Sequence, residues 1–319
     1  MTCRRIATSV LVLAFAAGAA GSAQAVNTPP ITAVEQPATV AAPGLRLAFA
    51  NQRYRAQIFP GATSTTVTYR TANDLITGLP IALQLDVYRP TGDSATSRPL
   101  LVWVHGGAFA FGNRSAMASE SIAYARLGYV TATISYRLDA DNKCLQVQAG
   151  GFTGAQLATE RARCERAVLA ARDDAAAAIA WLRANAATYG IDATRVAIGG
   201  SSAGAITAIH VGQSLNTAGS PPPAASRVSA VLAMSGCSYL DGSIDALDAP
   251  VAISASGGDG LVPFSCSAAT LDAAAAVGTP VVRSFFAGES GHAGGLYFAH
   301  QAEIDRAWRA FLIEHLELN

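Results

Sequence analysis

The sequence is poor in charge, in lysine and in aromatic side chains. Of its 319 residues 14% are charged and 7% are aromatic, Lys143 is the single lysine, and 22 basic side chains balance 22 acidic ones. A nucleic-acid-binding protein normally carries a basic stripe, and this sequence has no cluster of Lys and Arg. A disordered chain would contain fewer apolar residues than the 51% found here. The composition therefore predicts a folded protein whose core is buried by one large α/β domain or by two smaller ones.

Long apolar runs are also missing, except for one near the N-terminus. Two arginines precede an apolar stretch at 10–17, which is shorter than the roughly 20 residues that a membrane span needs. Ala23-Gln24-Ala25 then has the small-x-small pattern of a cleavage site. We expect residues 1–25 to be a signal peptide that is cleaved after about Ala25, although a buried N-terminal helix is the alternative. The mature protein is then secreted or periplasmic and has no membrane anchor.

Cysteines are few, and four remain once the expected signal peptide is removed. An even number of cysteines in an oxidising compartment suggests two disulfides, for which three pairings are possible. We favour Cys144–Cys164 and Cys237–Cys266, because each pair brackets one local segment. Four buried thiols are the alternative. No two cysteines lie within a few residues of each other, so the pattern does not favour a metal site.

Strand-like and helix-like segments alternate along most of the chain. Leu100–Val104 is a continuous apolar run, typical of a strand that is covered on both faces. The alternation predicts an α/β fold with a mostly parallel central sheet, helices on both faces and an antiparallel pair of N-terminal strands. We expect an N-terminal arm at 26–60 and a single catalytic domain at 61–319, with an insertion at about 138–165. The expected strands cover 65–70, 81–88, 100–104, 129–135, 195–199, 228–234, 251–254 and 281–286, and the expected helices cover 117–127, 158–189, 203–215, 267–277 and 299–314.

The strongest motif is Gly200-Ser201-Ser202-Ala203-Gly204. A G-x-S-x-G string alone is weak, but this one directly follows a predicted strand and opens a predicted helix, as a nucleophile elbow requires. Such a turn holds its serine in a strained backbone conformation and leaves room only for small neighbouring side chains. The free N–H groups at the start of the helix favour negative charge beside Ser202. A glycine-rich turn with a capping serine is the alternative.

A second motif, His105-Gly106-Gly107-Ala108-Phe109, follows the strand at 100–104. When an acyl carbonyl is attacked its oxygen becomes anionic, and backbone N–H groups can stabilise it where no side chain blocks the approach. An ordinary strand-to-helix loop is the alternative, although the loop lies upstream of an elbow in the expected order. We interpret His105 as a residue that braces this loop and not as a catalytic base.

A carboxylate and an imidazole follow two later strands. Asp259 lies in a glycine-rich segment after the strand at 251–254, and His292 follows the strand at 281–286. A serine hydroxyl needs a base to take its proton, and a carboxylate holds that base in the correct tautomer. Both residues come just after a strand, at the edge of a parallel sheet where sites form. The rival acids are Asp241, Asp245 and Asp248, and the weaker candidates are His210, His300, His315, Asp173 and Asp174.

Together these motifs resemble the α/β-hydrolase superfamily, and in particular its HGG-type serine esterase/lipase branch, which contains hormone-sensitive-lipase-like proteins and related carboxylesterases. Further matching segments are 85–90, Tyr136-Arg137-Leu138, Trp181-Leu182-Arg183 and Tyr189-Gly190-Ile191-Asp192.

The resemblance implies a serine carboxylesterase that needs no cofactor and no metal. Ser202 would be its nucleophile, His292 its base and Asp259 its acid. The backbone N–H groups of Gly106, Gly107 and Ala203 would form its oxyanion hole. The expected partner is a small-molecule or polymeric ester, and neither nucleic acid nor a membrane. A polyester depolymerase, a feruloyl-type esterase, a secreted serine peptidase and a non-catalytic binding protein remain as alternatives. Phe109, Phe111 and Phe264 are candidate pocket walls.

Overall fold

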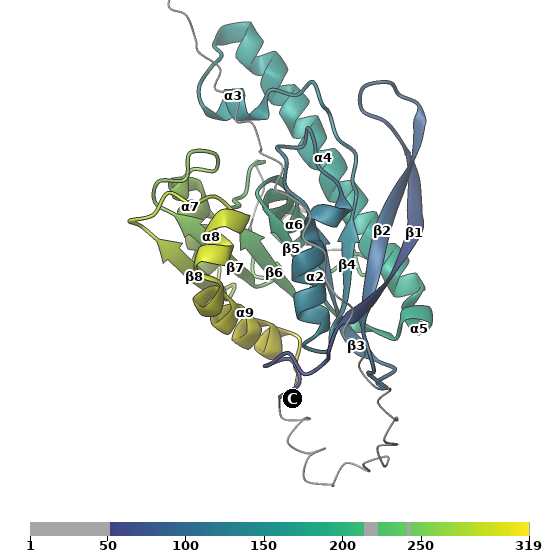
Figure 1. The fold of residues 1–319 in the computed structure, drawn as a ribbon. Helices are drawn as coiled ribbons and strands as arrows, with labels where there is room; N and C mark the ends of the chain where they lie inside the picture. Colours follow the sequence, from purple (N-terminus) through teal and green to yellow (C-terminus); the bar gives the residue numbers. More distant parts are fainter. Residues whose placement is uncertain (1–51, 214–222, 241–243, 319) are drawn as a thin grey trace, which may run out of the picture. The chain divides into compact units, whose positions relative to one another are not determined.

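An eight-stranded sheet forms the centre of the computed structural model, which describes residues 52–213, 223–240 and 244–318 (Figure 1). The expected signal peptide and most of the expected arm lie outside the described residues. In space the strands follow the order β1-β2-β4-β3-β5-β6-β7-β8. The strands are β1 (Ala62–Asn73), β2 (Pro80–Pro90), β3 (Arg98–Val104), β4 (Val130–Ile134), β5 (Ile191–Ser201), β6 (Ala230–Met234), β7 (Val251–Ser256) and β8 (Val281–Phe286).

The sheet is mixed, and its antiparallel part lies at one edge. β1 pairs with β2 in antiparallel register from Ala62 opposite Pro90 to Asn73 opposite Pro80. β2 is also antiparallel to β4, whereas every later pair of neighbours, from β4–β3 to β7–β8, is parallel. The predicted mostly parallel sheet with an antiparallel N-terminal strand pair is therefore confirmed. The parallel strands all end at one edge, which is where the loops that carry the candidate residues begin.

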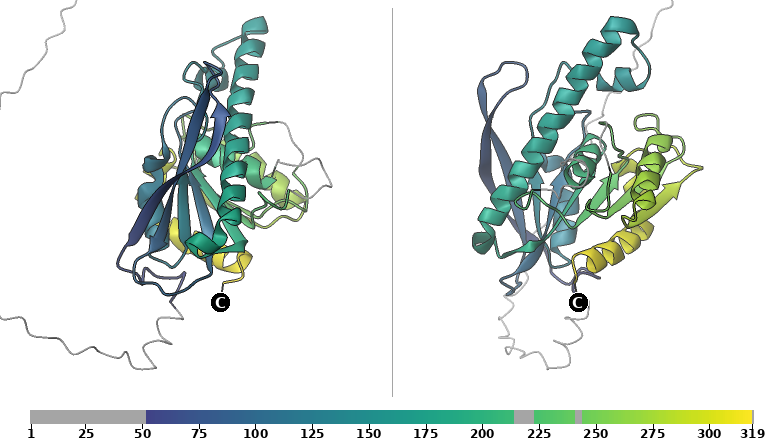
Figure 2. Two further views of the ribbon diagram at one scale, coloured as in Figure 1. Left: turned by 90° about the vertical axis from the view of Figure 1, so that its right-hand side faces the viewer. Right: turned by 180° about the vertical axis from the view of Figure 1, so that it is seen from behind.

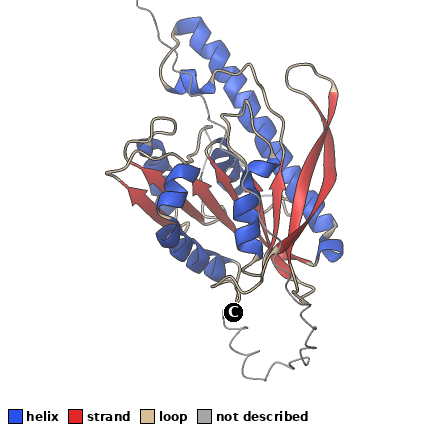
Figure 3. Ribbon diagram, viewed as in Figure 1, coloured by secondary structure: helices blue, strands red, loops and turns tan. Residues whose placement is uncertain are grey.

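Helices cover both faces of the sheet (Figure 3). In Figure 1 α2, α8 and α9 lie in front of the sheet, and the rear view in Figure 2 shows α4 on the other side. The side chains of β3 explain this arrangement, because Val102 packs in one core and Trp103 in the other. The helices are the 3-10 turn η1 (Arg114–Met117), α2 (Ala118–Ala125), α3 (Cys144–Gln148), α4 (Gly154–Ala184), α5 (Ala186–Tyr189), α6 (Ala203–Gln213), α7 (Phe264–Ala276), α8 (Gly294–Ala299) and α9 (Gln301–His315).

One expected helix is divided in the structure, and another is preceded by a short helix that the sequence pattern did not predict. The segment expected as one helix at 158–189 begins earlier, as α4, and is interrupted at Asn185 before α5. The Asn185 side chain donates a hydrogen bond of 2.8 Å to the carbonyl of Trp181, which closes α4. The segment expected at 299–314 corresponds to α9, and the short helix α8, which ends at Ala299, precedes it. A single side-chain hydrogen bond such as that of Asn185 leaves little trace in an apolar pattern, so the pattern indicated the helical region but not its interruption.

The disulfides join the pairs that the sequence favours. Cys144 of α3 is bonded to Cys164 of α4, and Cys237 after β6 is bonded to Cys266 of α7. The first bond closes the segment of the expected insertion. Among the described residues, no helix combines the length and the apolar character that crossing a bilayer requires.

Candidate active site

Ser202 occupies a sharp turn between β5 and α6. Its φ of 55° lies in the left-handed region, which is unfavourable for a residue with a Cβ. A Cβ on Gly204 would collide with the carbonyl groups of Val104 and His105, so the helix can approach β3 only because this position is glycine. The N–H of Ser202 donates to the carbonyl of Met234 at 2.8 Å, which fixes the turn to the end of β6. This is the strained strand-to-helix geometry that the motif predicts.

Three predicted residues from distant parts of the chain meet at this turn. The Oγ of Ser202 lies 2.8 Å from Nε2 of His292. The Nδ1 of His292 lies 2.9 Å and 2.8 Å from the two carboxylate oxygens of Asp259. Since an ionised carboxylate can only accept hydrogen bonds, Nδ1 carries the proton and Nε2 is left to accept from the serine hydroxyl. The arrangement is therefore set up to remove a proton from Ser202.

The carboxylate of Asp259 is buried and well supplied with donors. Its side chain is 1% exposed, and Oδ1 accepts backbone hydrogen bonds from Leu261 at 2.8 Å and Val262 at 3.0 Å. Burial by itself raises the pKa of Asp259, but the hydrogen bonds from His292, Val262 and Leu261 outweigh it and hold the pKa below its usual value. Asp259 thus remains ionised at neutral pH and can stabilise a protonated imidazole.

The loop after β3 lies directly against the nucleophile. A Cβ on Gly106 would lie 2.8 Å from the carbonyl oxygen of Ser201 and 3.2 Å from Cβ of Ser202, so this contact requires glycine. Ala203 begins α6, where the first N–H groups have no acceptor within the helix. Gly106 and Ala203 therefore border Ser202 from two sides, and Gly107 follows in the same loop.

Side chains outside the motifs hold this loop in shape. His105 is buried, its Nδ1 lies 2.7 Å from the carbonyl of Gly106, and its ring stacks on Tyr136 at 4.4 Å between centroids. Burial lowers the pKa of His105. The hydroxyl of Tyr136 donates to the carbonyl of His105 at 3.0 Å, and the amide of Asn142 donates to that of Ala108 at 3.0 Å. These contacts fit a bracing role for His105, and no motif in the sequence predicts the same role for Tyr136 or Asn142.

The weaker candidates have other partners. His210 is buried in α6, where Nε2 accepts from the N–H groups of Tyr239 and Leu240, and burial lowers its pKa to about 4. Asp248 accepts from the N–H of Asp245 at 2.8 Å, and burial raises its pKa to about 6. Asp174 binds Arg70 and Arg137, Asp173 binds Arg172, and His300 lies 3.1 Å from Glu289. Asp241 lies outside the described residues.

A groove of about 240 Å³ adjoins the loop after β3. Phe111, which is 65% exposed, lines it together with Lys143, Cys144 and Leu145 of the disulfide-linked segment. The interpretation of Phe109 as a pocket wall is wrong, because this residue is 3% exposed and packs in the core.

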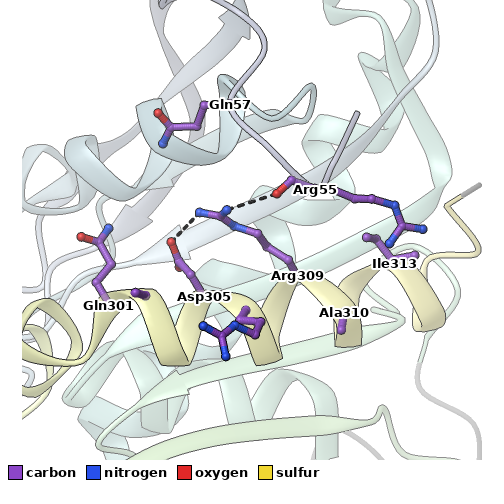
Figure 4. Close-up of a pocket in the computed structure, with 9 residues that line it drawn as sticks. Arg55, Gln57, Gln301, Asp305, Arg309, Ala310 and Ile313 are labelled. Carbon is purple, nitrogen blue, oxygen red and sulfur yellow. Dashed lines mark hydrogen bonds and ion pairs between the residues drawn. The ribbon is translucent and has the colours of Figure 1, made fainter. Parts of the chain in front are cut away.

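A groove of about 660 Å³ lies elsewhere, along α9 (Figure 4). Arg309 donates there to the carboxylate of Asp305 at 2.6 Å and to the carbonyl of Arg55 at 3.2 Å. Ser202, His292 and Asp259 do not line this groove, so it is not part of the candidate active site. In the part of the chain that the structure describes, no group of three or more His, Cys, Asp or Glu is arranged to hold a metal ion.

Comparisons with known proteins show which families and folds this chain is similar to. Residues 79–141 match the carboxylesterase family, and residues 161–246 match a family described by the α/β-hydrolase fold. Lipase 1 of Geotrichum candidum is 30% identical over 131 residues, which is 40% of this chain and 21% of the lipase. Carboxylesterase 5A of Felis catus is 34% identical over 126 residues, 39% of this chain and 20% of that enzyme. The matched region thus spans about a fifth of the length of these curated relatives.

Solved structures resemble a larger part of the chain. A propionate-bound esterase from Thermogutta terrifontis gives a TM-score of 0.59 at 19% identity and covers 82% of this chain and 97% of its own. The apo form of Thermogutta terrifontis esterase 2 gives a TM-score of 0.56 at 20% identity, covering 80% and 95%. At this level of identity the likeness shows the fold, and the fold is that of the α/β hydrolases.

Proposed function

We propose that this chain is an exported serine carboxylesterase of the carboxylesterase/lipase family, which parts of its sequence match. One observation carries the proposal, namely the unbroken chain of hydrogen bonds from Ser202 through His292 to Asp259. A structural role needs no such chain, because a buried histidine can be satisfied by backbone groups, as His210 is.

In the first half of the reaction Ser202 Oγ attacks the acyl carbonyl carbon while its proton passes to Nε2 of His292. The ionised carboxylate of Asp259 stabilises the imidazolium that results. When the tetrahedral intermediate collapses, the bond to the alcohol oxygen breaks and Nε2 returns the proton to that oxygen. The product is an acyl-enzyme on Ser202, together with the free alcohol.

In the second half water attacks the acyl-enzyme by the same route. His292 takes a proton from the water as the water oxygen bonds to the acyl carbon. When this second intermediate collapses, the bond from the acyl carbon to Ser202 Oγ breaks, Nε2 returns the proton to Oγ, and the carboxylic acid leaves. In both halves the carbonyl oxygen becomes an anion that needs donors already in position. We assign this task to the N–H groups of Gly106, Gly107 and Ala203, since Gly106 contacts the nucleophile and Ala203 lies in the first turn of α6. This chemistry requires no cofactor.

Labelling by a fluorophosphonate tests the nucleophile directly. The wild-type protein is expected to react covalently and to hydrolyse p-nitrophenyl acetate, and Ser202→Ala is expected to lose both activities. Ser201→Ala is the matched control, because it removes the neighbouring hydroxyl from the same turn and should leave labelling intact. A wild-type protein that neither reacts nor hydrolyses any ester would favour a non-catalytic binding protein.

A series of p-nitrophenyl esters of increasing chain length, set beside an insoluble polyester and a feruloyl ester, would define the substrate. A preference for the shortest soluble esters would favour a carboxylesterase that acts on small substrates. Faster hydrolysis of the insoluble polymer than of the soluble esters would instead favour a depolymerase, and cleavage of a peptide would favour a peptidase.

Export is the remaining part of the proposal. The two disulfides support it, because such bonds persist in oxidising compartments. The mass of the protein recovered outside the cytoplasm should correspond to a chain that begins after about Ala25. Recovery of the full-length chain from the cytoplasm would contradict export.

A further inference from the structure

Two buried serines contact the peptide groups on either side of His292. The hydroxyl of Ser256 donates to the carbonyl of Gly291 at 2.6 Å. The N–H of Ala293 donates to the hydroxyl oxygen of Ser235 at 2.8 Å. Both serines are fully buried, so neither hydroxyl can exchange these partners for bulk water. The backbone around His292 is therefore held on both sides by side chains at the ends of β6 and β7.

Ser235 also belongs to the segment that fixes the nucleophile. It directly follows β6, whose last residue, Met234, accepts the hydrogen bond from the N–H of Ser202. Its own N–H donates to the carbonyl of Ser254 at 2.8 Å. Met234 thus binds the backbone of the nucleophile, Ser202. The next residue, Ser235, binds the backbone of Ala293, which directly follows the base His292.

The backbone on both sides of this contact is strained. Ser235 has a φ of 52° and Ala293 a φ of 45°, both in the left-handed region that residues with a Cβ avoid. Such conformations persist only where surrounding contacts impose them. The hydrogen bond between these two residues is a contact of this kind, and it lies next to His292.

Ser256 links the base to the acid in the same way. It ends β7, and its carbonyl accepts the N–H of Asp259 at 3.3 Å, while its hydroxyl holds Gly291. The turn that carries the carboxylate and the loop that carries the imidazole are therefore tied to one residue.

We propose that Ser235 and Ser256 are positioning residues that keep the imidazole of His292 in line between Ser202 and Asp259. The inference rests on the proposed function. Removing either hydroxyl leaves a buried peptide group without its partner and allows the loop to shift, and a displacement of about 1 Å costs about 100-fold in rate. We expect kcat to fall by about 10- to 100-fold in each variant and KM to stay within about twofold, because neither serine contacts substrate.

The test compares Ser235→Gly and Ser256→Ala with Ser254→Ala. Glycine at position 235 accepts the left-handed backbone without strain and removes the hydroxyl together with the Cβ that carries it. Ser254 is the matched control, because it is a fully buried serine of the same strand as Ser256, and its hydroxyl has no hydrogen-bond partner within the described residues. Each variant is measured for kcat, KM, its thermal midpoint and the downfield NMR signal of the proton between His292 and Asp259.

The proposal expects a lower kcat and a broadened or missing downfield signal in the two test variants, with both properties kept in the control. Ser256→Thr retains the hydroxyl and should restore kcat, which a general loss of stability would not do. The proposal would be overturned if the test variants matched Ser254→Ala in kcat and in the downfield signal. It would also be overturned if the test variants differed from the wild type only by a lower thermal midpoint. Since the signal is read without substrate, an inactive wild-type protein would refute the esterase function and leave this inference to be decided by the signal.

Discussion

Replacing Asp259 by asparagine should impair the reaction by forcing the wrong tautomer on His292. The oxygen Oδ1 of Asp259 faces the two N–H donors of Leu261 and Val262, so the carbonyl oxygen of an asparagine must take that position. The amide NH₂ group then takes the position of Oδ2, which lies 2.8 Å from Nδ1 of His292. The Oδ1 position lies 2.9 Å from Nδ1, but it already accepts from two backbone N–H groups. We therefore expect Nδ1 to accept from the NH₂ group and the imidazole proton to move to Nε2, which faces Ser202.

An imidazole with its proton on Nε2 cannot take a proton from the serine hydroxyl. We therefore expect kcat for p-nitrophenyl acetate to fall by about 10⁴-fold at neutral pH, equivalent to about 5 kcal/mol of transition-state stabilisation. Asp245→Asn is the control, since its Oδ1 accepts the N–H of Leu247 at a rival position after β6. A larger loss of activity in Asp245→Asn than in Asp259→Asn would show that the acid is assigned to the wrong residue.

Two further predictions concern stability. The Cys144–Cys164 bond closes a loop with a sequence separation of 20, so replacing both cysteines by serine should lower the free energy of unfolding by about 3 kcal/mol in urea titrations. Burial works to raise the pKa of Asp93, but hydrogen bonds from Arg53 and Arg98 outweigh it and lower the pKa to about 2. A lowered pKa stabilises the fold above about pH 4 and loses that effect as the pH falls towards 2. Asp93→Asn should therefore cost about 2 kcal/mol at pH 7 and almost nothing near pH 2, and an equal cost at both pH values would refute the assignment.

The sheet could be predicted because each of its strands has a local signature. In β2 the alternation of Leu83, Leu85 and Val87 predicts one buried face, and these three residues are buried. The continuous run Leu100–Val104 predicts a strand covered on both sides, and its residues divide between the two cores. The interruption at Asn185 depends on one side-chain hydrogen bond, which apolar periodicity does not record.

In the candidate site, too, some residues have a local sequence pattern that predicts them and others do not. The serine and glycine residues around position 202 form a motif, because a sharp turn imposes small residues at fixed spacing. Asp259 and His292 could be chosen from several acids and histidines by their position just after a strand. Ser235, Ser256 and Tyr136 also lie at or just after the end of a strand, but nothing in the sequence indicated that they hold the loops of the site. Their contacts join segments 31 to 58 residues apart, and a single serine or tyrosine does not reveal such a distant partner.

The residues with a strained backbone show why contacts that the sequence does not predict matter for the site. Among the described residues, seven non-glycine residues have a positive φ, and five of them belong to the site: Ala108, Phe109, Ser202, Ser235 and Ala293. Each such conformation costs about 1–3 kcal/mol and needs support from outside its own segment. That support comes from the ends of β6 and β7 and from the side chains of Tyr136 and Asn142, which hold the loops with hydrogen bonds of 2.6–3.0 Å. The motifs therefore specify which groups can react, and the sheet edge that supports them determines whether those groups meet.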